Sequence, residues 1–140
     1  MVPAGEPFCF ATQERADIFI SNFVRAADEM LDVAVTSPLC SSNVDKAASS
    51  TLHAANSMHV VKETKYSKSK VHCTPIVVET LGAWTAQSLE FFKKLASAVA
   101  SRTGLTRGKQ LYSIMLSLSV LLQKENGRML ALRYFGEPSP

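Results

Sequence analysis

The chain has 140 residues, 46% of them hydrophobic and 19% charged, a balance typical of one folded domain rather than a disordered segment. Its 15 Lys and Arg residues against 12 Asp and Glu give a net charge of +3, which permits a nucleic-acid partner without indicating one. Apolar runs are only a few residues long, so we expect no membrane span, and the N-terminus lacks a secretory pattern. Three widely spaced cysteines favour an intracellular setting over a disulfide framework.

The N-terminal part predicts a lead-in followed by two strands. Residues 1–14 carry Pro and Gly without periodicity and predict a flexible segment. Residues 15–22 are rich in Ile and Phe and predict a strand. Residues 30–37 alternate apolar and polar side chains and predict a second strand, which Pro38 ends. The connector over 23–29 fits a short loop or one helical turn.

The rest of the chain predicts helices around one further strand. An Ala-rich stretch without Gly or Pro predicts a helix over 43–67, and a short apolar run predicts a strand over 73–80. Thr85 is placed to cap a helix that runs to about residue 102, where Gly104 ends it. A final helix is expected over 106–134.

This order of elements predicts an α/β fold, in which a small mixed β-sheet is flanked by helices and followed by a long C-terminal helix. We expect a core over residues 15–104, a helical extension over 105–135 and a tail over 136–140.

Each of the first two predicted strands contains an aspartate, a residue that strands disfavour. A hairpin whose paired positions sum to 49 places Asp17 opposite Asp32, with Cβ atoms about 5 Å apart. Two carboxylates this close repel one another unless a cation lies between them, and Mg²⁺ suits carboxylate oxygens. The alternative is that each aspartate only caps a turn or a strand end.

A basic cluster follows at the end of the first predicted helix. Lys62, Lys65 and Tyr66 share one helical face, and Lys68 and Lys70 extend the positive charge beyond it. One lysine would reach the carboxylates and hold a phosphate oxygen or the attacking water. Lys62 lies one turn deeper than Lys65, so we expect Lys62 nearer the sheet and Lys65 nearer a phosphate. The alternative is a solvated basic helix end.

These residues together resemble a known family. Arg15-Ala16-Asp17, then Asp32, then Lys62-x-x-Lys65-Tyr66 resembles the restriction-endonuclease-like, PD-(D/E)XK domain of early-branching non-LTR retrotransposons. The stretch over 75–84 also resembles the segment that follows the lysine helix in reverse-transcriptase-encoding proteins of animal mobile elements. Ala16 departs from the usual proline, and Ala34 stands where the standard motif has its lysine.

The resemblance implies a Mg²⁺-dependent DNA endonuclease, with Mn²⁺ as a substitute, in which Asp17 and Asp32 bind the metal and Lys62 or Lys65 is the catalytic lysine. It also implies a reverse transcriptase module in a longer parent protein, and a nuclear location. Glu79 is a candidate third metal ligand, with a structural role as the favoured alternative. The candidate DNA-contacting residues are Arg15, Lys65, Tyr66, Lys68 and Lys70.

Two other classes remain open. One is a catalytically inactive remnant of the same fold that binds DNA or another protein. The other is an all-helical adaptor in which no sheet forms. The residues do not indicate an oligomeric state or a target sequence.

Overall fold

The chain folds around one three-stranded sheet. The computed structural model describes residues 16–25, 27–69 and 72–136. Strands β1 (Ile18–Val24) and β2 (Ala27–Thr36) form an antiparallel hairpin, and β3 (Cys73–Glu79) lies parallel to β2 in the order β1-β2-β3. The fold is therefore the expected mixed α/β arrangement, and the all-helical alternative is wrong.

The hairpin has the register that the aspartate spacing predicted. In the pairs from Ile18↔Leu31 to Ile20↔Glu29, the two residue numbers add to 49. The register shifts before the turn, where Arg25 has a left-handed φ of 53°. The connector is thus shorter than expected, because β1 continues to Val24 and β2 already begins at Ala27. The pairing of the two strands is irregular between Ile20 and Val24.

The helix expected over 43–67 is broken into α1 (Val44–Ala47) and α2 (His53–Tyr66). The break contains the run Ser49-Ser50-Thr51. Within it, Ser49 Oγ donates a hydrogen bond to the carbonyl of Lys46. Such side chains compete for backbone groups and disfavour helix interiors. Leu52 then adopts a left-handed conformation with a φ of 60°, which separates the two helices.

Helices α3 (Ala86–Thr103) and α4 (Arg107–Phe135) lie within a residue or two of their expected bounds. Thr85 caps α3 by accepting from the Ser88 N–H, and Thr106 caps α4 in the same way. Gly104 ends α3 with a φ of 72°, a conformation that glycine adopts at low cost. These local signals explain why the sequence located both helices well.

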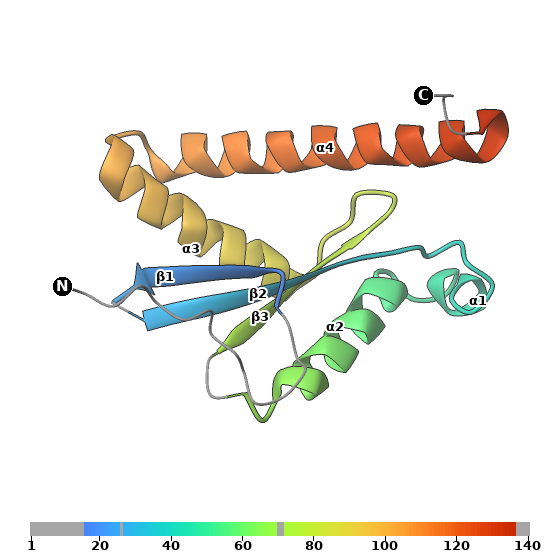
Figure 1. Ribbon diagram of the computed structural model, residues 1–140, viewed down its shortest axis with the longest axis horizontal. Helices are drawn as coiled ribbons and strands as arrows, with labels where there is room; N and C mark the ends of the chain where they lie inside the picture. Colours follow the sequence, from blue (N-terminus) through green and yellow to red (C-terminus); the bar gives the residue numbers. More distant parts are fainter. Residues whose placement is uncertain (1–15, 26, 70–71, 137–140) are drawn as a thin grey trace.

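The helices form a layer on each side of the sheet, with α3 and α4 on one face and α2 on the other (Figure 1). Leu31 and Ile76 from the sheet pack against Phe91 and Phe92 of α3. Residues of α4 that pack on this cluster are Leu111, Ile114, Met115 and Leu118. The expected helical extension thus contributes to the core.

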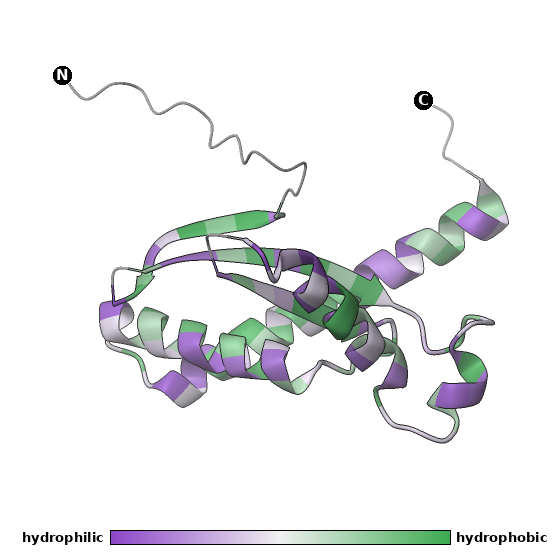
Figure 2. Cartoon of the chain, turned by 90° about the horizontal axis from the view of Figure 1, so that it is seen from below, coloured by the Kyte–Doolittle hydropathy of each residue, from purple (hydrophilic) through white to green (hydrophobic). Residues whose placement is uncertain are grey.

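The C-terminal part of α4 extends beyond the rest of the fold (Figure 2). It exposes apolar side chains, among them Met129, Leu130, Tyr134 and Phe135. None of the helices in the described ranges has the length and apolarity that crossing a bilayer requires.

Candidate functional site

The side of helix α2 that faces the sheet is apolar near the start of the helix and polar toward its end. Ala54 and Ala55 are buried near its N-terminus, where their small side chains let the helix lie close to the sheet. Further along, the inward positions are taken by His59, Lys62 and Tyr66, which are three and four residues apart and so share one side of the helix. This polar interface is the unusual feature of the fold, since a helix normally buries apolar residues here.

Asp32 lies beneath this polar face, in the middle of β2, and is only 4% exposed. Lys62 Nζ donates to both carboxylate oxygens at 2.8 Å. Lys65 Nζ lies 3.9 Å from Asp32 Oδ2 and donates to the Tyr66 hydroxyl at 2.9 Å. The tyrosine hydroxyl in turn bonds to Asp32. One buried carboxylate is therefore held by three polar side chains from a single helix.

The pKa of Asp32 reflects a balance between burial of the carboxyl group and its interactions with the polar side chains of α2. Burial acts to raise the pKa of the carboxyl, but the hydrogen bonds from Lys62 and Tyr66 and the charges of Lys62 and Lys65 outweigh it. The pKa of Asp32 therefore lies below its ordinary value of 3.8, and the group is ionised at neutral pH. The buried position of Tyr66 raises the pKa of its phenol, so the hydroxyl stays protonated and able to donate.

Asp17 lies immediately before β1 and is held against β2 by its side chain. Its Oδ2 accepts a hydrogen bond from the backbone N–H of Val33, the residue after Asp32, at 2.7 Å. Its own N–H donates to the carbonyl of Leu31 at 2.9 Å. These bonds fix the Asp17 carboxylate beside the stretch of β2 that carries Asp32. Unlike Asp32, Asp17 is exposed to solvent.

Glu79 does not join this site. In the β2–β3 register Asp32 lies beside Pro75, and Glu79 is four residues further along, about 13 Å at strand spacing. Its Oε1 accepts from the Ala55 N–H in the first turn of α2, at 3.3 Å. Because Leu52 provides no side-chain cap, the Glu79 carboxylate satisfies part of this helix N-terminus. The geometry therefore favours a structural role for Glu79 over a role as a metal ligand.

The candidate DNA-contacting residues separate into three groups. Arg15 and Lys70 lie outside the described residues. Tyr66 is only 6% exposed, so it presents little surface to a nucleic acid, contrary to expectation. Lys65 and Lys68 are exposed, and the Lys65 side chain is 42% exposed against 21% for Lys62. The order expected for the two lysines, with Lys62 deeper and Lys65 nearer solvent, agrees with these values.

The acidic side chains near this site offer only carboxylate oxygens as donors to a metal ion. Carboxylate oxygens suit Mg²⁺, which usually keeps several waters and binds one or two carboxylates together with substrate phosphates. Within the described ranges, no group of three or more His, Cys, Asp or Glu side chains could hold a metal ion. Asp17 and Asp32 alone therefore do not form a closed protein cage for a metal ion.

The sequence pattern located both aspartates and both lysines but missed the part that Tyr66 plays. Its spacing of four residues from Lys62 was the available signal, since it placed the hydroxyl on the same face. Comparisons with known proteins add no assignment: no family model, no curated protein and no solved structure matches the chain.

Proposed function

We propose that this chain is a metal-dependent endonuclease domain, derived from a retroelement, that hydrolyses DNA phosphodiester bonds. The observation that supports this most is the Lys62 ammonium on both oxygens of the buried Asp32, within a hairpin that also holds Asp17 against the same strand. Two acids held against one strand, with a lysine ammonium at one of them, are groups that metal-dependent phosphodiester hydrolysis uses.

Each residue has a distinct role in this proposal. Asp17 and Asp32 would hold Mg²⁺, which lowers the pKa of a bound water and stabilises charge on a phosphate. Lys62 would neutralise negative charge that develops on the phosphate oxygens. Lys65, which is more exposed, would bind a neighbouring phosphate of the DNA backbone. Tyr66 would position the lysines, because its hydroxyl accepts from Lys65 and bonds to Asp32.

A catalytically inactive DNA-binding or protein-interaction remnant is the second candidate, and one observation favours it. Lys62 already occupies both oxygens of Asp32, and a backbone N–H occupies Asp17 Oδ2. A site in which Asp32 is fully engaged and Asp17 partly so is stable without a metal. In an active enzyme, Lys62 would have to leave Asp32 so that this carboxylate could hold a metal ion.

The two candidates differ in a nicking assay on supercoiled plasmid with and without Mg²⁺. An active domain converts plasmid to open circles only with the metal, and Asp32→Asn or Asp17→Asn abolishes this conversion. Asp45→Asn is the matched control, since it removes an exposed acid from α1. Plasmid binding by gel shift without any nicking would identify the inactive remnant. Nicking by Asp32→Asn at the normal rate would exclude the assigned site.

A further inference from the structure

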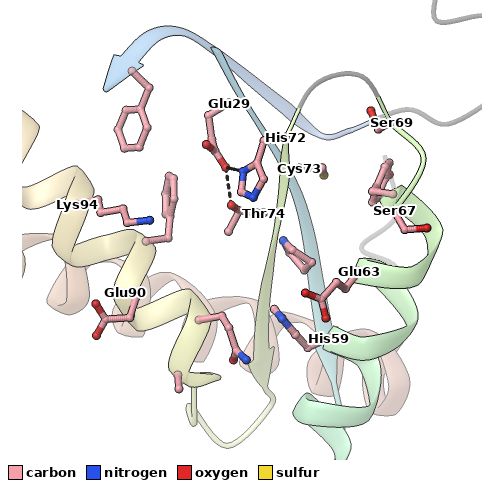
Figure 3. Close-up of a pocket in the computed structure, with 16 residues that line it drawn as sticks. Glu29, His59, Glu63, Ser67, Ser69, His72, Cys73, Thr74, Glu90 and Lys94 are labelled. Atoms are coloured by element: carbon pink, nitrogen blue, oxygen red, sulfur yellow. Dashed lines mark hydrogen bonds and ion pairs between the residues drawn. The ribbon is translucent and has the colours of Figure 1, made fainter. Parts of the chain in front are cut away.

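A second polar region lies apart from Asp17, Asp32 and the two lysines. It is a groove of about 590 Å³ at the free edge of β3, between α2 and α3 (Figure 3). His59 and Glu63 line it from α2, Glu90 and Lys94 from α3, and Glu29 from β2. The proposed endonuclease function assigns no role to these side chains. We refer to this region as the edge groove.

His59, which lines the edge groove, has a buried polar atom without a hydrogen-bond partner in the described part of the chain. The side chain is only 5% exposed, and its Nδ1 has no hydrogen-bond partner among the described residues. A buried polar atom without a partner costs about 1–3 kcal/mol, so native structures rarely keep one without a reason. In the neutral Nε2–H tautomer, Nδ1 is a hydrogen-bond acceptor. A donor that reached this atom through the groove would therefore satisfy it.

The charges around the edge groove indicate the sign of that ligand. Glu63 follows His59 by one helical turn and forms no hydrogen bond or ion pair with any described residue. On the other side of β3, Glu29 accepts from His72 at 2.9 Å and from Thr74 through the same Oε1. With Glu90, whose carboxylate pairs with Lys93 on α3, three glutamates line the groove against Lys94, whereas the whole chain carries a net +3. The groove is thus acidic on a basic protein.

The backbone of β3 adds further acceptors at the same place. Its even-numbered residues face β2, as the bond from Met30 N to the His72 carbonyl shows, so Cys73 and Pro75 face outward. Further along the strand, Ser88 covers the outward groups of Val77. Within the described part of the chain, the outward backbone groups of Cys73 and Pro75 form no hydrogen bond, although Pro75 itself is buried. Because proline has no N–H, this stretch offers more carbonyl acceptors than donors.

We propose that the edge groove binds an extended peptide that pairs with β3 at Cys73–Pro75 and places a lysine or arginine side chain beside Glu63 and His59, on the α2 side of the strand. Addition of a strand to an open sheet edge is a common mode of peptide recognition. An ammonium or guanidinium group carries only donors, and they match the carboxylates and the His59 Nδ1. The peptide backbone supplies the N–H groups that the outward carbonyls lack.

The test is fluorescence anisotropy with a labelled peptide of alternating threonine and lysine, titrated with the full chain at low salt. We expect saturable binding that weakens about tenfold in Glu63→Gln, because a charge-assisted hydrogen bond is lost. Glu125→Gln is the matched control, since that carboxylate pairs with Arg128 on α4 outside the groove, and it should leave the affinity unchanged. The same peptide with glutamine in place of lysine should not bind.

His59→Leu provides an independent measurement. It removes the unpaired atom, so we expect a melting temperature at or above that of the natural chain together with weaker peptide binding. Equal binding of the lysine and glutamine peptides, or an unchanged affinity in Glu63→Gln, would overturn the proposal. Spermidine serves as a free cation without a peptide backbone. Competition by spermidine at the peptide's own affinity would overturn the pairing with β3.

Discussion

Replacement of Lys62 by methionine isolates the interaction at the centre of the candidate site. Methionine keeps the length of the side chain and has nearly the same helix propensity as lysine, so α2 itself should be undisturbed. The change removes the ammonium that donates to both oxygens of Asp32. Asp32 then remains buried and ionised, with only Lys65 and Tyr66 as partners.

The expected loss of stability in Lys62→Met depends on how deeply the Lys62–Asp32 ion pair is buried. Removal of one partner from a fully buried ion pair costs about 3–5 kcal/mol. Lys62 is 21% exposed and Lys65 stays 3.9 Å from Asp32, so part of the charge remains compensated. We therefore expect a loss of about 2 kcal/mol in the free energy of unfolding at neutral pH, or about 8 °C in melting temperature for a domain of this size.

The pH dependence provides a sharper signature than the loss itself. In the natural chain the pKa of Asp32 lies below 3.8, so its stabilising contribution is constant above that pH and is lost only on stronger acidification. Without Lys62, two of the influences that lower the pKa of Asp32 are gone while burial, the largest influence, still raises it, so we expect the folded-state pKa to rise above the unfolded value. The folded variant then gains a proton as the pH falls, and its deficit in stability shrinks between pH 7.5 and pH 5.0.

Urea unfolding at pH 7.5 and pH 5.0, followed by circular dichroism, measures both effects. Lys65→Met is the matched control, because that side chain is 42% exposed and its ion pair should contribute no more than about 1 kcal/mol. The double variant Asp32→Asn/Lys62→Met should recover most of the loss. A deficit for Lys62→Met that is the same at both pH values would refute the assigned role of the buried carboxylate.

Further substitutions test other parts of the structure. Lys62→Ala should abolish plasmid nicking while DNA binding persists, whereas Lys65→Ala should weaken binding and lower its salt slope by about one, as read from gel shifts over a salt series. Glu79→Ala removes the carboxylate at the start of α2 and should cost about 1 kcal/mol in thermal unfolding, without loss of Mg²⁺-dependent nicking. Ser88→Ala leaves a buried β3 N–H unsatisfied and should cost about 1–3 kcal/mol in urea unfolding. Arg25→Gly relieves a left-handed φ of 53° at an exposed turn and should raise stability by up to about 1 kcal/mol, and a lower melting temperature would contradict this.

The sequence by itself determined the elements that carry strong local signals. Thr85 and Gly104 delimit α3 because a cap and a left-handed glycine act within one helical turn. The register of the hairpin away from its turn also followed from the sequence, because the spacing of Asp17 and Asp32 indicated it. The relative depth of Lys62 and Lys65 followed from helical spacing alone.

Tertiary structure decided the features that depend on distant partners. Tyr66 is buried against Asp32, and Glu79 is directed to the start of α2, because the packing of α2 on the sheet sets both environments. The edge groove arises only where β3 ends the sheet between two helices, which no local pattern reports. The spacing of residues along a helix or strand determines which side chains share a face. Only the packing of helices and strands on one another determines which residues that face contacts.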